Sequence, residues 1–272
     1  MIPDLFNIEN KVVIITGGLG QLGRQFTRGL VLYGANVIIL DILPSNNNYY
    51  LHLTDELGSS HLDYYQVDIT NKESIDIVSK NIIRKWDCPS GLINTAAIDA
   101  PPNASLENAG PLELYSEAAW DKMLEVNVKG TFLCCQIFGS EMAKKNRGSI
   151  INISSIYGMV SPDQRIYQYR RKKGEQFYKP VAYSVSKSAI YNLTRYLATY
   201  WGEQNVRVNT ITFGGVFNNQ DKEFLQEYCI RVPLGRMASE NEYTGAIVFL
   251  LSDASSYMTG SNMIIDGGWT AW

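Results

Sequence analysis

A tyrosine and a lysine four residues apart are the side chains of this sequence best suited to proton chemistry. Tyr183 and Lys187 belong to the segment YSVSK at the start of a stretch with helical periodicity. Side chains at positions i and i+4 share one face of a helix. A phenol has an ordinary pKa of about 10, so proton exchange near pH 7 needs about 4 kcal/mol of preferential stabilisation of the phenolate. We expect the ammonium of Lys187 to supply it; a pair on a surface helix is the alternative.

Two further polar residues precede this pair. Ser155 ends an apolar run, at a place where a hydroxyl can point into the cleft beyond the carboxyl edge of a sheet. Asn127 lies inside an otherwise apolar helical stretch, and a buried amide costs free energy unless it has hydrogen-bond partners. Ser155 would therefore hold a substrate oxygen beside Tyr183, and Asn127 would sustain a water or proton relay. A mere helix kink is the alternative for Asn127.

A glycine-rich turn, TGGLGQLG, follows the first apolar run and precedes a helical stretch. Gly17 and Gly20 would let the backbone turn and approach a pyrophosphate, and Gly23 would let the helix close on the sheet. The N-terminus of that helix would present free N–H groups and positive partial charge. The segment predicts a dinucleotide site that includes Gln21 and Leu22; a tight turn without a ligand is the alternative.

An acidic residue, Asp41, ends the second apolar run. At this place in a dinucleotide-binding fold, a carboxylate accepts hydrogen bonds from the adenosine ribose hydroxyls and repels a 2′-phosphate. No arginine or lysine follows in residues 42–44 to bind such a phosphate. We therefore expect NAD(H) to be preferred over NADP(H). A solvated or capping aspartate is the alternative.

Short apolar runs alternate with longer helical patterns along the chain. Runs that are apolar on both faces belong to a parallel sheet covered by helices on each side. The pattern predicts a doubly wound α/β fold with a seven-stranded parallel sheet, in one domain over residues 1–272. Polar segments at 98–116 and 161–180 are expected to be long loops that border a site. The expected strands cover residues 12–15, 37–40, 62–67, 91–94, 150–153, 206–211 and 263–265, and the expected helices 21–33, 72–86, 117–145, 182–200 and 241–251.

The composition argues against several classes of function. A net charge of -3 over 272 residues leaves too little basic excess for a dedicated nucleic-acid binder, so the expected partner is a small molecule. Two histidines and no GxSxG motif argue against a Ser-His-Asp hydrolase. The four cysteines show no CxxC spacing, so we expect neither a metal site nor a disulfide framework. The start of the chain does not resemble a signal peptide and no apolar stretch reaches about 20 residues, so we expect a cytoplasmic protein that does not bind a membrane.

These motifs occur in the order found in the short-chain dehydrogenase/reductase family, which the chain resembles from Lys11 to Trp272. Three further segments carry the resemblance: DIT at 68–70 looks like the family's adenine-contacting segment, NTAA at 94–97 like its NNAG segment, and PLGR with DGG like its C-terminal signature. The resemblance implies a Rossmann-like fold and an NAD(P)-dependent oxidoreductase that moves a hydride between the cofactor and an alcohol or carbonyl.

The family's residue roles transfer position by position. Tyr183 would be the general acid/base, with Ser155 orienting the reacting oxygen and Asn127 sustaining the proton relay. Lys187 would lower the phenol pKa and bind the nicotinamide ribose. The cofactor site that the resemblance implies comprises Gly17, Gly20, Gln21, Leu22, Gly23, Asp41, Asp68, Ile69, Asn94, Ala96, Tyr183, Lys187, Gly214, Val216 and Asn218.

Three residues depart from the family's compact branch. Gln21 stands where that branch usually has glycine, which gives the glycine spacing of the extended branch of epimerases and dehydratases. The chain ends directly after the last expected strand, so we expect the compact form without the larger C-terminal substrate domain. Phe213 replaces the usual proline after the sixth strand, and Asn218 stands where a threonine often contacts the cofactor's carboxamide. An asparagine offers that amide both a donor and an acceptor.

A further departure is an insertion at 161–180, which makes the gap between Ser155 and Tyr183 more than double the family's usual spacing. It contains aromatic residues and the basic run 170–173. We expect it to lie over the substrate entrance and to suit a phosphorylated or sugar-like ligand; a plain solvated loop is the alternative. The detailed resemblance, including IDAPP at 98–102, is to bacterial members associated with surface or flagellar glycan synthesis.

The leading hypothesis is a reversible dehydrogenase that exchanges hydride between free NAD(H) and a secondary alcohol or ketone, which includes sugars and sugar phosphates. An epimerase or dehydratase that uses NAD without net consumption is one alternative, and a non-catalytic nucleotide-binding protein is another. The family resemblance implies a homotetramer or a dimer built on the helices expected at 117–145 and 182–200.

Overall fold

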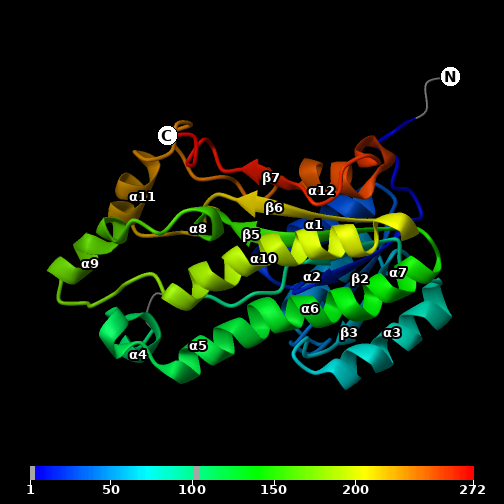
Figure 1. Cartoon of the computed structure of the whole chain (residues 1–272), viewed down its shortest axis with the longest axis horizontal. Helices are drawn as coiled ribbons and strands as arrows, with labels where there is room; N and C mark the ends of the chain where they lie inside the picture. The colour runs from blue at the N-terminus through cyan, green and yellow to red at the C-terminus, as the bar shows by residue number, and fades with distance from the viewer. Residues whose placement is uncertain (1–3, 101–103) are drawn as a thin grey trace.

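The computed structural model describes residues 4–100 and 104–272, and within them the strands form one parallel sheet (Figure 1). The strand order is β3-β2-β1-β4-β5-β6-β7, which confirms the predicted doubly wound, seven-stranded α/β fold. The order reverses between β1 and β4, and such a reversal leaves a crevice at the carboxyl ends of the strands where ligands bind. The strands are β1 (Val12–Thr16), β2 (Asn36–Asp41), β3 (Leu62–Gln66), β4 (Gly91–Asn94), β5 (Gly148–Ser155), β6 (Val206–Phe213) and β7 (Asn262–Ile265).

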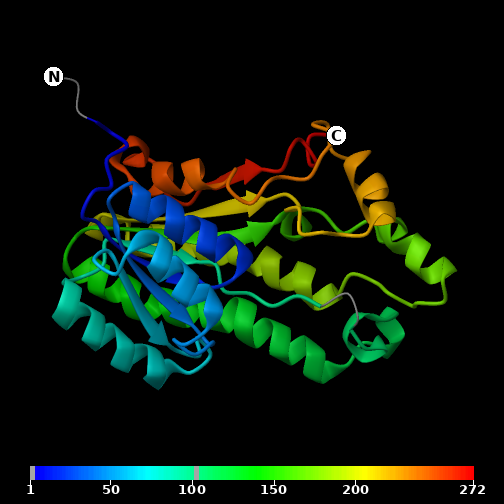
Figure 2. The ribbon, with the colours of Figure 1, turned by 180° about the vertical axis from the view of Figure 1, so that it is seen from behind.

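Side chains that alternate along the strands give the sheet two apolar faces. Val13 and Ile15 of β1 pack on one side and Ile14 on the other. Helices α1, α2 and α12 cover the first side, and α3, α10 and the segment from α5 to α7 cover the second (Figure 1, Figure 2). The apolar runs are therefore strands buried on both faces. These helices are α1 (Gln21–Leu32), α2 (Asn48–Leu57), α3 (Lys72–Trp86), α5 (Glu117–Leu124), α6 (Thr131–Cys134), α7 (Ser140–Lys144), α10 (Val181–Tyr200) and α12 (Thr244–Leu251).

The helix predicted over 117–145 is helical from Glu117 to Lys144 but changes its type of turn along the way. Two π-helical segments, Glu125–Gly130 and Cys135–Gly139, separate α5, α6 and α7. Single π turns inside α-helices are frequent at functional sites. The first π segment contains Asn127.

Helices also occur where the sequence predicts none. Leu53 is the one residue buried among those of α2, so its apolar periodicity is too weak to recognise. The insertion, expected to be a loop, contains a 3₁₀ turn (Gln164–Tyr167) and α9 (Gln168–Lys172). The remaining α-helices are short: α4 (Leu106–Ala109), α8 (Ile156–Met159) and α11 (Lys222–Cys229). Part of the expected loop 98–116 lies outside the described ranges, namely residues 101–103, which include both prolines of IDAPP.

The carboxyl ends of the strands point toward α9 and α11, which lie side by side at one end of the molecule (Figure 2). Tyr169 of α9 donates a hydrogen bond to Asp221 before α11 at 2.7 Å, and Lys173 pairs with Glu223 at 2.8 Å. The insertion is thereby joined to the segment that follows β6.

Candidate active site

A cavity of about 380 Å³ opens at the carboxyl ends of β5 and β6. β5 ends at Ser155, and α10 begins two residues before Tyr183, so the two elements bring these side chains to the same cavity. The insertion contributes Tyr167 and Lys179 to the lining, and the segment around α11 contributes Phe224 and others.

The Tyr183 phenol and the Lys187 ammonium lie on one face of α10. Lys187 Nζ lies 5.8 Å from the centroid of the Tyr183 ring and donates a hydrogen bond to the Ile153 carbonyl oxygen at 3.2 Å. Ser155 Oγ accepts a hydrogen bond from Tyr157 N at 3.2 Å and is also hydrogen-bonded to the Tyr183 side chain. The structure thus brings three of the predicted catalytic residues together.

The structure does not show the lowered phenol pKa that the sequence predicts. Burial is the largest influence and raises the pKa of Tyr183, Asp99 raises it further, and the hydrogen bond with Ser155 lowers it. Burial also lowers the pKa of Lys187 to about 8, against opposing stabilisation of the ammonium by Asp99. Desolvation disfavours the charged forms of both groups, and it outweighs their proximity.

Asn127 clamps a backbone segment beside the cavity. Its Oδ1 accepts a hydrogen bond from Ile98 N at 2.8 Å, and its Nδ2 donates to the Ile98 carbonyl oxygen at 3.0 Å and to Ser186 Oγ at 3.0 Å. The amide therefore joins the π turn to the segment after β4 and to α10. Asn127 is buried and does not line the catalytic cavity itself, so it acts on the site through its neighbours.

A second cleft, of about 690 Å³, runs past the glycine turn and the ends of β1 and β2. Gly17 has φ +63°, and a Cβ there would lie 2.7 Å from Ala96 Cα. A Cβ at Gly23 would lie 2.3 Å from the Gly17 carbonyl oxygen. The turn therefore requires glycines, and it forms a backbone cradle at a helix N-terminus that fits a pyrophosphate. The cleft joins the catalytic cavity through residues that line both: Gln21, Leu22, Thr95 and Ala97.

Asp41 lies at the end of β2 in this second cleft. Its Oδ2 accepts a hydrogen bond from Leu19 N of the glycine turn at 2.9 Å, and its Oδ1 accepts one from Leu43 N at 3.2 Å. The sequence analysis missed Arg24, which α1 brings to the same cleft. Its guanidinium donates to the Leu19 carbonyl oxygen at 2.6 Å and stacks on Tyr49, so it is already engaged.

Not all of the predicted cofactor residues line this cleft. Asp68, Ile69 and Ala96 do. Asn94 instead turns into the interior, where its Nδ2 donates to Asn152 Oδ1 at 2.8 Å. A β-strand directs alternate side chains to opposite faces, and Asn94 bridges β4 to β5 rather than facing the cofactor cleft.

Asn218 is exposed and does not line the catalytic cavity, whereas Gly214, Val216 and Gln220 do. Gln220 folds back on the turn after β6, where its Nε2 donates to the Val216 carbonyl oxygen at 2.9 Å and its Oε1 accepts from Asn218 N at 2.8 Å. Gln220, which the sequence analysis did not name, therefore lines the cavity where Asn218 was expected, and both atoms of its amide are bonded to the turn itself.

The structure accommodates the two departures nearest the cofactor cleft. Gln21 Nε2 donates to the Phe217 carbonyl oxygen at 2.9 Å and so links the glycine turn to the segment after β6. Phe213 is buried, with its ring centroid 6.0 Å from that of Phe26 and 4.0 Å from that of Tyr243. Phe213 thus packs into the core between α1 and α12.

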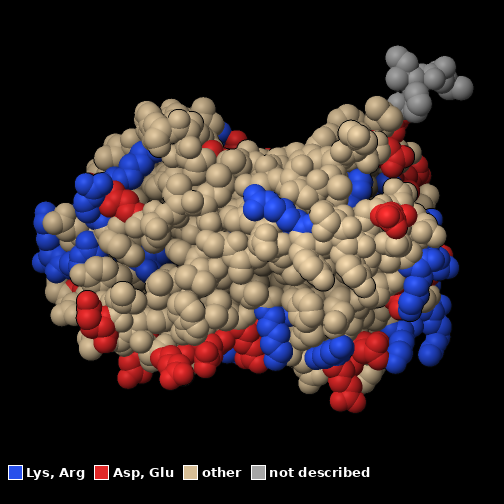
Figure 3. Space-filling model, viewed as in Figure 1, with Lys and Arg blue, Asp and Glu red and all other residues tan. Residues whose placement is uncertain are grey.

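The basic run of the insertion does not face the catalytic cavity, contrary to expectation. Arg170 pairs with Glu175, and Arg171 donates to the carbonyl oxygens of Gln164 and Phe177 at 2.7 and 3.1 Å. Figure 3 shows basic side chains gathered, with acidic ones among them, at the end of the molecule that carries α9. Arg170 and Arg171 stabilise the fold of the insertion, and no residue of the basic run lines the catalytic cavity.

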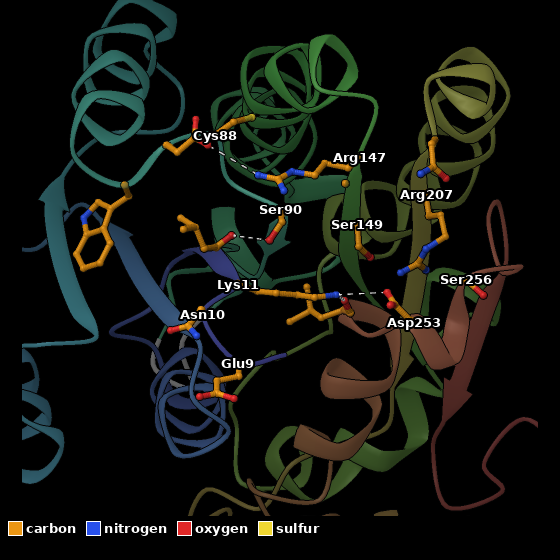
Figure 4. Close-up of a pocket in the computed structure, with 16 residues that line it drawn as sticks. Glu9, Asn10, Lys11, Cys88, Ser90, Arg147, Ser149, Arg207, Asp253 and Ser256 are labelled. Atoms are coloured by element: carbon orange, nitrogen blue, oxygen red, sulfur yellow. Dashed lines mark hydrogen bonds and ion pairs between the residues drawn. The ribbon is translucent and has the colours of Figure 1, made fainter. Parts of the chain in front are cut away.

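A third hollow, of about 550 Å³, lies at the opposite edge of the sheet, near the amino ends of the strands (Figure 4). Its cations are engaged: Lys11 Nζ donates to the Leu251 carbonyl oxygen at 2.8 Å and lies 3.6 Å from Asp253 Oδ1. Arg207 donates to the Leu250 carbonyl oxygen at 2.7 Å. These contacts join the strands to the end of α12, and the predicted catalytic residues lie at the other edge.

The described residues contain neither a grouped set of metal ligands nor a helix that could span a membrane. Within residues 4–100 and 104–272, no three His, Cys, Asp or Glu side chains are grouped so as to hold a metal ion. In the same part of the chain, no helix has both the length and the apolar character needed to cross a bilayer.

Comparison with known proteins identifies the family. The chain matches the family model described as enoyl-(acyl carrier protein) reductase over residues 20–270. It is 33% identical to an NAD-dependent glycerol dehydrogenase of Listeria innocua, over 97% of this chain and 96% of that protein. It is 30% identical to post-translational flagellin modification protein A of Campylobacter coli, over 96% and 99%. Other relatives are named for acting on sugars or polyols.

A solved structure agrees with this assignment. The short chain dehydrogenase of Leptospira borgpetersenii, with bound NAD⁺, has a TM-score of 0.85 and 34% identity, and the match covers 99% of this chain and 97% of that chain. The resemblance drawn from the sequence is thus confirmed: the chain belongs to the short-chain dehydrogenase/reductase family and is an NAD(P)-dependent oxidoreductase.

Proposed function

We propose that this protein is an NAD-dependent dehydrogenase that interconverts a secondary alcohol of a polyol or sugar with the corresponding ketone. The observation that carries the proposal is the junction of the two clefts. Ser155, Tyr183 and Lys187 line the catalytic cavity, and the cleft that fits a dinucleotide opens directly into it.

The proposed mechanism uses these residues in the roles that the family resemblance assigns. The nicotinamide cofactor, when bound, accepts the hydride in oxidation and donates it in reduction. In oxidation, Ser155 Oγ orients the substrate hydroxyl, and Tyr183 Oη takes its proton as the hydride leaves the carbon. In reduction, Tyr183 returns a proton to the carbonyl oxygen. Lys187 stabilises the phenolate, and Asn127 fixes the Ile98 backbone and the Ser186 hydroxyl beside the site, so that a proton relay keeps its geometry.

We propose NAD(H) as the preferred cofactor. Asp41 is buried at the end of β2, where its carboxylate would meet the adenosine ribose. Two cations line the same cleft: Arg24 is engaged by a carbonyl oxygen and by the Tyr49 ring, and Lys122 pairs with Glu125 at 3.5 Å, which leaves both poorly placed to offset a 2′-phosphate.

The lining of the catalytic cavity supports a polyol or sugar as the substrate. Tyr157, Tyr167 and Tyr228 present rings, against which the C–H faces of such a molecule can pack. The basic run of the insertion lies elsewhere, so it gives no support to a phosphorylated substrate. The glycerol dehydrogenase relative has a polyol substrate, which favours the same class.

The proposal is tested by a fluorescence titration with NADH and NADPH, followed by absorbance assays against glycerol, pentitols, hexitols, sugar phosphates and simple ketones. We expect tighter binding of NADH and turnover of a polyol. Tyr183→Phe is expected to reduce turnover about 10²- to 10⁴-fold while NADH binding persists. Binding of neither nucleotide would overturn the proposal, and NAD that copurifies and is never released would favour an epimerase or dehydratase.

We further propose a cytoplasmic, single-domain homo-oligomer, a tetramer or a dimer, that uses α10 and the helical segment 117–144. The face that carries these helices has few charged side chains at its centre (Figure 3). These helices expose the large side chains Phe132, Val185, Tyr196 and Tyr200, and exposed apolar surface favours association. The four cysteines are free, which suits a reducing compartment. Light scattering after gel filtration measures the oligomeric state.

A further inference from the structure

An ion pair that the proposed mechanism does not use lies in the catalytic cavity. Lys179, near the end of the insertion, pairs with Asp99 of the segment after β4, and both residues line the cavity. The side chain of Lys179 is 13% exposed and that of Asp99 is 38% exposed. Lys179 Nζ lies 4.4 Å from the centroid of the Tyr183 ring, so the pair is adjacent to the residue that exchanges the proton.

The insertion is folded so as to hold Lys179 in this position. The side-chain amide of Gln164 makes two hydrogen bonds to the Lys179 backbone. Gln164 Oε1 accepts from Lys179 N at 2.9 Å, and Gln164 Nε2 donates to the Lys179 carbonyl oxygen at 3.0 Å. The Gln164 carbonyl oxygen is itself held by Arg171 at 2.7 Å. Arg171 of the basic run thus reaches the cavity indirectly, because it holds Gln164, which holds the lysine.

The pair has unused hydrogen-bonding capacity of both kinds. An ammonium has three donors, and the ion pair with Asp99 occupies one of those of Lys179. A carboxylate has about four lone-pair sites, and those of Asp99 receive Lys179 and Ala100 N. A donor and an acceptor side by side match a hydroxyl group, which both donates and accepts. An anionic group would instead be repelled by the negative charge of Asp99.

We propose that Lys179 and Asp99 recognise the hydroxyl group on the carbon next to the reacting carbon of a polyol substrate. This inference rests on the proposed function and assigns a specificity site to it. A substrate hydroxyl held by Ser155 and Tyr183 would have its neighbouring hydroxyl directed to the pair. A monohydric alcohol lacks that second hydroxyl and makes no use of the pair.

The test compares a pentitol with 2-pentanol as substrates at saturating NAD⁺. The measured quantity is the ratio of the two kcat/KM values. Lys179→Met and Asp99→Asn are each expected to lower this ratio about tenfold or more, because each removes a charged hydrogen-bonding partner. The control is Lys172→Met, which changes an exposed lysine of the same insertion and is expected to leave the ratio within about twofold. Thermal melting and NADH titration verify that each variant is folded.

The outcomes separate this inference from the proposed function. If the wild-type protein oxidises the pentitol and neither variant changes the ratio, the specificity site is wrong and the proposed function stands. If the variants lose both substrates in parallel, with a displaced pH profile of kcat, the pair acts on Tyr183 and not on the substrate. If a pentitol phosphate is preferred and Lys179→Met abolishes that preference, the site binds anions. A wild-type protein that oxidises only 2-pentanol overturns the polyol assignment and the specificity site together.

Discussion

Lys187 Nζ and the Tyr183 ring are neighbours on one face of α10, with 5.8 Å between the atom and the ring centroid. Lys187 is 6% exposed, and burial lowers the pKa of its ammonium to about 8. A charge in such a place reduces the stability of the fold, because desolvation of the ammonium is only partly offset by its neighbours. In the proposed function, the site therefore keeps a group that would serve catalysis although it lowers the stability of the fold.

Lys187→Met is expected to raise the free energy of unfolding at pH 7 by up to about 3 kcal/mol, since each unit of pKa shift corresponds to about 1.4 kcal/mol. The same change is expected to reduce turnover about 100-fold or more, because the phenolate loses its nearby cation. Urea denaturation of both proteins without cofactor, together with a turnover assay, checks these values.

The difference in stability between the wild-type protein and Lys187→Met is expected to depend on pH. Between pH 8 and 10.5 the unfolded chain binds the Lys187 proton more tightly than the folded protein does. The wild-type protein therefore gains stability relative to the variant as the pH rises through this window. An advantage of Lys187→Met that is as large at pH 10 as at pH 7 would contradict the assignment, and the exposed substitution Lys172→Met should show no such dependence.

Asp41→Asn tests the cofactor preference with little disturbance of the glycine turn. The amide oxygen can still accept the hydrogen bond from Leu19 N, which Asp41→Ala would lose. Without the negative charge, the ratio of kcat/KM for NAD⁺ to that for NADP⁺ is expected to fall about 10- to 100-fold, because hydrogen bonds to a charged group are worth about 1.5–3 kcal/mol. Steady-state kinetics with both nucleotides measure it, and an unchanged ratio would remove Asp41 from the cofactor assignment.

Asn127→Ala is expected to lower the free energy of unfolding by about 1–3 kcal/mol, because it leaves the N–H and carbonyl groups of Ile98 without their partner. Urea denaturation at pH 7 measures this loss. Asn127→Asp retains the acceptor for Ile98 N but has no donor for the Ile98 carbonyl oxygen or for Ser186, and it places a carboxylate in a buried position, so it should destabilise the fold at least as much as Asn127→Ala does. If both variants keep wild-type turnover, the relay role of Asn127 is wrong.

The sequence was sufficient to predict the sheet and the residues gathered at its carboxyl edge. The strands are buried on both faces, so their apolar runs are unambiguous, and each motif is tied to the end of a strand or the start of a helix. Ser155 and Tyr183 therefore meet as expected. The short helices were missed where few residues are buried, as in α2 with Leu53 alone.

Contacts between distant segments could not be predicted from spacing. Asn94 faces the interior because of the direction of its side chain on β4, and Asn218 is displaced by the way Gln220 folds back. Lys179 and Asp99 are 80 residues apart in sequence, and no spacing between motifs brings the two together. The phenol pKa depends on burial, which residue order does not give.

Gln164→Ala provides a test of how the insertion acts on the substrate. The substitution removes both side-chain hydrogen bonds to the Lys179 backbone and leaves the ammonium itself intact. A less constrained lysine makes a weaker contact with the bound polyol, so the KM for a pentitol should rise about five- to tenfold, with kcat changed less than about threefold.

Arg165→Ala is the matched control, because Arg165 lies in the same 3₁₀ turn, is exposed, and pairs with Asp163 outside the cavity lining. Its kinetic constants should stay within about twofold of the wild-type values. Steady-state kinetics with a pentitol and with 2-pentanol distinguish the two explanations for an effect at Gln164. A rise in KM for the pentitol alone means that the insertion positions Lys179 for a second hydroxyl, whereas an equal loss of kcat for both substrates means that it maintains the geometry of Tyr183.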